Sequence, residues 1–227
     1  MEQEKLLQMK PFVEGVCASI ETINPELHKK ICPDKPIEPY SEMLKLAKEL
    51  GFKTSMTIVI GLGEKQEDFP LLERFIDQHK LDRITFYALK PVKGTRYTKS
   101  PEAEEYAWWI AKTRIRFPNI EIIAGLTPKK AEEYAGLILK SGANALTKFP
   151  IVKKFNSKQA IEIERQAREE REFKGTLTKM PEIDWDREIE KLPFEQELKE
   201  DTKEKIHSII AKMKGEKNTA IISDDYE

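Results

Sequence analysis

Strand-like and helix-like segments alternate regularly from residue 15 to about residue 150, and this alternation limits the fold more than any other feature. Short apolar or β-branched runs predict strands at residues 16–20, 54–60, 83–89, 120–124 and 143–149. Apolar residues at helical spacing predict helices between them, at residues 40–50, 67–79, 100–116 and 127–142. The third helix is expected to start at Ser100-Pro101, a capping residue followed by a proline in the first turn.

Repeated βα units imply parallel strands joined by right-handed crossovers. Their spacing of roughly 30 residues suits a (β/α) barrel or an open doubly wound sheet. A closed barrel needs about eight units, whereas the chain offers five strands, and residues 1–12 look like the end of a preceding helix. We therefore expect an α/β fold, a partial (β/α) TIM-like barrel of about five parallel strands with outer helices, which begins in the middle of the fold.

The sequence beyond residue 150 is more highly charged. Residues 157–173 and 195–214 predict two charged helices, and residues 174–193 between them predict irregular structure. The expected domains are a partial barrel over residues 1–155 and a charged helical C-terminal extension over residues 156–227. We interpret the extension as an amphipathic helix packed under the barrel. Alternatively, the extension covers an exposed strand edge or binds another subunit.

Composition narrows the classes of function and location. The formal net charge is −1, so no overall basic field points to nucleic acid or to an anionic membrane. No apolar run approaches the ~20 residues of a membrane helix, and residues 1–10 lack the apolar core of a signal peptide. Only two cysteines occur, which is too few for a disulfide framework. We expect a cytoplasmic protein without nucleic-acid or membrane partners.

Ligands of parallel α/β folds bind at the carboxyl ends of the strands. Glu21 lies at the first such end, where a carboxylate can accept ribose hydroxyls or bind an amino group; capping of the next helix is the alternative. Ser19 lies two residues earlier and is expected to face the same side of the strand. Gly61 and Gly63 allow close approach to a ligand, or form an ordinary turn, and Glu64 is expected to brace their loop.

Five segments carry a resemblance to a known family. Residues 19–28, Ser-Ile-Glu-Thr-Ile-Asn-Pro-Glu-Leu-His, resemble the fourth-strand segment of the biotin synthase group of radical S-adenosylmethionine (SAM) enzymes. Residues 57–64 are similar to its fifth-strand pattern G-x-I-x-G-x-x-E, and residues 91–95 match its sixth-strand P-x-x-G-T. Ala124-Gly125 and the tripeptide at residues 142–144 stand where the group has A-G-R and G-A-N. The resemblance covers about residues 16–150.

The resemblance implies the cofactors and the site. SAM is expected at Glu21, through its ribose or its methionyl amine, with Ser19, Gly61 and Gly63 nearby. The strand after residue 83 would pass along the adenine, with Ala88 and Leu89 as backbone or apolar contacts or, alternatively, as plain barrel core. The implied activity is SAM-dependent radical chemistry on an unidentified small or protein-bound substrate of the lipoyl or biotin type.

The resemblance also implies a [4Fe–4S] cluster, held by three closely spaced cysteines in the pattern C-x3-C-x2-C. Cys17 and Cys32, fifteen residues apart, cannot form this site, so no residue of the chain is predicted to bind metal. The protein is expected to be inactive unless a second chain supplies the cluster-binding half. Cys17 is interpreted as a buried, inert thiol. Leu126 replaces an arginine that helps to bind an auxiliary cluster in biotin synthase, which argues against biotin synthase proper.

Two other functions are consistent with the sequence. The chain could be a non-catalytic binding or scaffold module derived from such a barrel, with its charged extension used for association. An unrelated α/β enzyme could bind a phosphate at Gly61-Leu62-Gly63, although Lys65 is the only basic or hydroxyl side chain near that loop.

Overall fold

Five strands lie side by side in one parallel sheet in the order β1-β2-β3-β4-β5, as the alternation predicted. This is the α/β arrangement of a partial TIM-like barrel. The structure is a computed structural model, which describes residues 3–126, 131–170 and 172–215, apart from the side chain of residue 133. The chain divides into two compact units, Met1–Phe149 and Pro150–Glu227.

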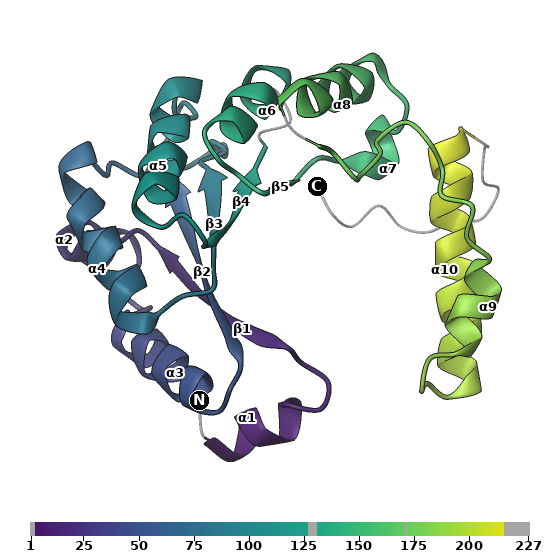
Figure 1. The fold of residues 1–227 in the computed structure, drawn as a ribbon, viewed down its shortest axis with the longest axis horizontal. Coiled ribbons are helices and arrows are strands. Elements are labelled where there is room, and N and C mark those ends of the chain that lie inside the picture. The colour runs from purple at the N-terminus through teal and green to yellow at the C-terminus, as the bar shows by residue number, and fades with distance from the viewer. Residues whose placement is uncertain (1–2, 127–130, 171, 216–227) are drawn as a thin grey trace. The chain divides into compact units, whose positions relative to one another are not determined.

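The first unit contains the sheet and its helices (Figure 1). Its elements are α1 (Gln3–Met9), β1 (Gly15–Glu21), α2 (Pro25–Ile31), α3 (Glu38–Glu49), β2 (Lys53–Ile60), the 3₁₀ helix η1 (Gln66–Asp68), α4 (Phe69–His79), β3 (Arg83–Ala88), α5 (Ala103–Arg116), β4 (Glu121–Gly125), α6 (Ala131–Lys140) and β5 (Ala145–Thr147). The predicted start of the last helix, residues 127–130, lies outside the described residues.

The two faces of the sheet differ in polarity because side chains alternate along each strand. One face is apolar, and Figure 1 shows the helices of this unit packed along that side. Its buried apolar side chains include Ala18, Ile20, Met56, Ile58, Ile60, Ile84, Phe86, Ile122 and Ala124. The opposite face carries small and polar side chains in register across the strands, with Ser19 opposite Thr57 and Thr57 opposite Thr85. This polar face corresponds to the interior of a complete barrel.

Aromatic packing joins two of the outer helices. Trp109 of α5 is 1% exposed, and its ring centroid lies 6.0 Å from that of Phe69 of α4. The neighbouring Trp108 meets the same phenylalanine edge-on at 5.8 Å. These ring contacts place the Trp108-Trp109 pair in the packing of the outer layer of helices.

The start of α5 differs from the prediction. The helix begins at Ala103 with Glu102 as its N-cap, so Ser100-Pro101 is not its start. Pro101 is instead a buried loop residue whose carbonyl accepts a hydrogen bond from the hydroxyl of Tyr134. Its ring also packs against Gly61 at the end of β2. Tertiary contacts therefore hold the proline in the loop and override a local helix-start signal.

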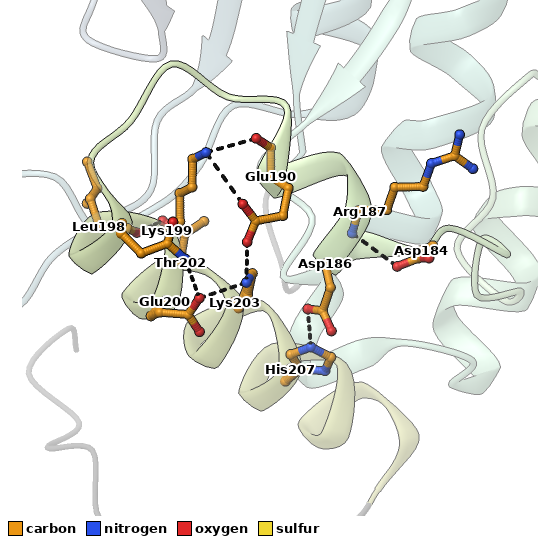
Figure 2. Close-up of polar contacts among 11 residues, drawn as sticks. Asp184, Asp186, Arg187, Glu190, Leu198, Lys199, Glu200, Thr202, Lys203 and His207 are labelled. Atoms are coloured by element: carbon orange, nitrogen blue, oxygen red, sulfur yellow. Dashed lines mark hydrogen bonds and ion pairs between the residues drawn. The ribbon is translucent and has the colours of Figure 1, made fainter.

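The second unit is helical, with α7 (Ile151–Lys154), α8 (Lys158–Glu170), α9 (Trp185–Glu190) and α10 (Gln196–Lys214). The segment predicted to be irregular contains α9, because Asp184 caps that short helix by accepting a hydrogen bond from the Arg187 amide. Ion pairs connect α9 to α10, as Figure 2 shows. None of the described helices is both long and apolar enough to span a bilayer.

Candidate functional site

Glu21 ends β1 in an unusual backbone conformation. The pairing of β1 with β2 shifts between Ser19 and Glu21, which is a β-bulge. The Thr22 amide donates to the Ile20 carbonyl at 2.8 Å, and Glu21 between them has φ +65°. This is a three-residue γ-turn with positive φ, a strained arrangement that costs about 1–3 kcal/mol and that clusters at ligand sites.

The bulge also corrects the predicted relation between Ser19 and Glu21. Ser19 lies exposed on the polar face of the sheet, as does Cys17. The strict alternation that was expected to place Glu21 on that same face is interrupted before it reaches Glu21. Cys17 is exposed on an edge strand, so its interpretation as a buried thiol was wrong.

The Glu21 carboxylate is held by one cation. Lys35 Nζ lies 2.7 Å from Glu21 Oε1, and the side chain of Glu21 is 30% exposed. Burial acts to lower the pKa of Lys35, but the hydrogen bond and the charge of Glu21 outweigh it and raise that pKa. Glu21 Oε2 has no hydrogen-bond donor among the described residues, so it is free to accept a bond from a ligand hydroxyl or amine.

Thr22 adds an unsatisfied group beside Glu21. Its Oγ1 is buried and has no hydrogen-bond partner in the part of the chain that the structure describes. An unpaired buried hydroxyl costs about 1–3 kcal/mol, so this position favours a polar partner from outside those residues. An orphaned hydroxyl next to a half-buried carboxylate fits the polar edge of a nucleoside ligand.

The loop after β1 is tied to the loop after β2. Asn24 caps α2 by accepting hydrogen bonds from the amides of Glu26 and Leu27 at 3.1 Å. Its side-chain nitrogen donates to Asp68 Oδ1 of η1 at 2.8 Å. Asn24 of the β1 segment therefore caps α2 and ties the loop after β1 to η1.

Glu64 braces the loop after β2 from within. Its carboxylate accepts from the amides of Gly61, of Leu62 at 2.9 Å and of Gly63 at 3.1 Å. Burial raises the pKa of Glu64, and the hydrogen bonds from the Gly61 and Leu62 amides oppose the rise. Because a carboxylate already occupies the amides, the loop cannot cradle a phosphate, and the alternative reading of a phosphate site at Gly61-Leu62-Gly63 was wrong.

Gly61 and Gly63 have structural reasons to be glycine. Their φ angles are +107° and +116°, a region that side chains rarely adopt. A Cβ on Gly61 would lie 3.0 Å from Pro101 Cδ and 3.1 Å from Leu89 Cβ. Leu89 and Ala88 follow at the end of β3, both half-buried, and the Leu89 amide donates to the Ile60 carbonyl at 2.8 Å. Their predicted contact with adenine stays a prediction.

The described residues do not form a cluster site. Three thiolates are needed, and the chain has two cysteines, with Cys17 exposed on β1 and Cys32 at the C-cap of α2. No group of three or more His, Cys, Asp or Glu side chains in residues 3–126, 131–170 and 172–215 could hold a metal ion. An iron–sulfur cluster therefore does not fit this chain by itself.

A parallel sheet with helices on one face, and with polar groups gathered where its strands end, defines an α/β protein of the (β/α) barrel class. The Radical SAM superfamily model matches residues 2–76, the part that carries Glu21 and the Gly61 loop. The chain belongs to the radical SAM superfamily and is biotin synthase-like. The family's cofactors are SAM and a [4Fe–4S] cluster.

Individual proteins are also similar to this chain. An uncharacterised protein of Methanocaldococcus jannaschii is 38% identical over 218 residues, covering 88% of this chain and 60% of that protein. Biotin synthase of Parabacteroides distasonis is 30% identical over 47% of this chain and 33% of the enzyme. Biotin synthase of Coxiella burnetii is 29% identical over 64% of this chain and 47% of the enzyme. The chain thus spans three fifths or less of the length of these relatives.

Sequence reasoning missed two polar partners at this edge. Lys35 lies in a proline-containing loop between α2 and α3, and no local pattern connects it with Glu21. Thr22 was part of the motif, but nothing in the sequence indicates that its hydroxyl would be buried without a partner. The capping role of Asn24 could have been found, because an asparagine followed by proline is a helix-start signal.

Proposed function

We propose that this chain supplies the nucleoside-binding part of a SAM site in a radical SAM protein, with Glu21 as the residue that accepts hydrogen bonds from the ribose or the methionyl amine. The observation that carries the proposal is the strained turn that places a half-buried carboxylate with one free oxygen at the end of β1. The orphaned Thr22 hydroxyl beside it supports a polar ligand. Bound together with a reduced [4Fe–4S] cluster as the electron donor, SAM would supply radical chemistry.

The chain's own residues would bind and orient SAM. Glu21 Oε2 would accept a donor from the ligand while Lys35 fixes Oε1, and the Gly61 loop, braced by Glu64, would border the nucleoside. The cluster would be held by cysteines outside these 227 residues, on the same polypeptide or on a second chain. The substrate stays open, with sulfur insertion as one of several radical reactions, and cytoplasmic location stays part of the proposal.

Titration calorimetry of the full chain with SAM tests the proposal. Replacing Glu21 by Gln keeps the shape and removes the charge, so SAM affinity should fall about tenfold to a hundredfold, the worth of charge-assisted hydrogen bonds. Glu26→Gln is the matched control, since Glu26 is an exposed carboxylate on the adjacent helix α2. Its SAM affinity should equal that of the unaltered chain.

Two outcomes would contradict the proposal. The unaltered chain could fail to bind SAM, or Glu21→Gln could bind it as tightly as Glu26→Gln does. In either case, a defined oligomer or a stable complex with another protein would favour the alternative function, a scaffold module derived from a radical SAM barrel.

A further inference from the structure

Tyr87 lies in a gap in the sheet made by a glycine. Its partner across the pairing of β3 with β4 is Gly125, and a Cβ built on Gly125 would lie 2.5 Å from Tyr87 Cδ1. The ring therefore covers the backbone of β4 where a side chain would otherwise stand. Alternation from the buried Phe86 places Tyr87 on the polar face of the sheet, near its carboxyl edge.

Lys148 reaches this ring from β5. It follows the last residue of that strand, and its Nζ lies 5.1 Å from the centroid of the Tyr87 ring. The side chain thus extends from β5 across β4 to β3. Lys148 has φ +66°, and Glu21 at the end of β1 has φ +65°. A non-glycine residue with strained backbone therefore stands at the carboxyl end of β1 and immediately after β5.

The ammonium of Lys148 has no carboxylate partner in the described part of the chain. Cations at the opposite, amino-terminal edge of the sheet are instead matched by acids. These matched pairs are Lys53 with Glu14, Arg83 with Glu121, and Lys48 with Asp82. Of these two edges of the sheet, the carboxyl edge is therefore the one with a lysine that no described carboxylate matches, and ligands bind at that edge in this fold class.

The loop after β3 adds to this charge. It carries Lys90, Lys93, Arg96 and Lys99, all exposed, and no acidic residue occurs between Arg83 and Glu102. None of these four cations forms an ion pair with a described residue. The hydroxyl of Tyr97 donates to the Leu62 carbonyl at 3.4 Å, which docks the loop on the end of β2.

The acid and the base stand at opposite ends of the strand order. Glu21 ends β1, whereas the ammonium of Lys148 lies over the Tyr87 ring of β3, so two strand spacings of about 4.8 Å, or roughly 10 Å along the sheet, separate the two charged groups. Glu21 and Lys148 are thus separate charged groups on the sheet, and this spacing allows a ligand at each of them.

We infer that Lys148, seated on the Tyr87 ring at the carboxyl edge of the sheet, binds an anionic group of the substrate, a carboxylate or a phosphate. The inference rests on the proposed function, since it names the substrate class of the same site. The tyrosine face and the glycine gap orient the ammonium, and an anion would form its charge-assisted hydrogen bond.

Calorimetric titration of the full chain with inorganic phosphate and, separately, with glutarate tests the inference. Lys148→Gln should lose about tenfold in affinity for the anion that the site prefers, and Lys148→Arg should retain it. Lys45→Gln, which removes an exposed lysine of α3 that forms no ion pair with a described residue, is the matched control. The anion that binds with the higher affinity shows whether the site prefers a phosphate or a carboxylate.

SAM titration of the same preparations keeps the two proposals separate. Lys148→Gln should bind SAM as the unaltered chain does, whereas Glu21→Gln should bind the anion normally. Equal anion affinity in Lys148→Gln and Lys45→Gln would overturn the inference, as would no binding by the unaltered chain at millimolar anion. If the unaltered chain does not bind SAM but binds the anion through Lys148, the proposed function is wrong and the inferred anion site stands.

Discussion

The strand β2 and the helix α10 show two different ways of stabilising structure. β2 has eight residues and buries four of them, whereas α10 has nineteen residues and buries none. The first unit is held by apolar area removed from water, which contributes roughly 25 cal/mol per Å². The second unit depends more on charged contacts, whose strength varies with salt and pH.

Figure 2 shows the charged contacts between α9 and α10. Glu190 accepts from Lys203 at 2.6 Å and from Lys199 at 3.5 Å, and His207 lies 2.8 Å from Asp186. Exposed ion pairs of this kind contribute little individually. The two units should therefore respond to different perturbations, the first to loss of buried apolar volume and the second to salt and pH.

Removal of a buried side chain should harm the first unit most. Leu44 of α3 is fully buried, so Leu44→Ala should lower the free energy of unfolding by about 2–5 kcal/mol through lost burial and a residual cavity. Hydrogen exchange of the β2 amides across a urea series measures the loss. The control is Leu198→Ala in α10, where the side chain is 48% exposed and the expected loss is under about 1 kcal/mol. Equal losses would refute the comparison.

The apolar core was predictable from sequence because it depends on local periodicity. Each of the five predicted strands exists with small changes at its ends, since β-branched runs bounded by glycine and proline are local signals. The order and parallel pairing followed from the βα alternation. Failures occurred where distant residues decide the structure, as when Tyr134 and Gly61 hold Pro101 in a loop.

The candidate site was predictable only as a set of positions. The strand-end rule found Glu21, but its positive φ arises from a bulge that no local pattern encodes. The Gly61 loop was found as well, although its amides bind Glu64 rather than a ligand. The contact of Lys148 with Tyr87 joins residues far apart in the chain through a glycine on a third strand, and only the three-dimensional pairing shows it.

Protonation of Glu164 of α8 should lower the stability of the second unit in acid. Its carboxylate is almost buried and accepts from the Leu177 amide at 2.8 Å, from Arg168 at 2.7 Å and from Thr178 at 3.0 Å. Burial alone would raise the pKa of Glu164, but these bonds together lower it to about 2. As pH falls, the carboxyl of Glu164 is protonated at a higher pH in the unfolded state than in the folded state. This stabilisation is therefore present above a pH of about 4.5 and is lost as pH falls toward 2.

The variant Glu164→Gln tests this point. At neutral pH it should cost on the order of 2–3 kcal/mol, because the amide replaces a charged acceptor of several bonds. Hydrogen exchange of the segment around Leu177 at pH 5 and below is the measurement. Protection there should fall with acid in the unaltered chain and stay flat in the variant. A parallel fall in both would show that other groups set the acid response.

The smallest effect concerns the ion pairs of α9 with α10. Glu190 and Glu200 raise the pKa of Lys203 by accepting its hydrogen bonds, yet the pairs lie at the surface and are screened by salt. Lys203→Gln should therefore weaken the protection of the α9 amides slightly at low salt and leave it unchanged at high salt. The control is Lys212→Gln, an exposed lysine in the last turn of the same helix. A loss that persists at high salt would show that Lys203 acts through the packing of its aliphatic stem, and the contrast between the two units would then be one of degree.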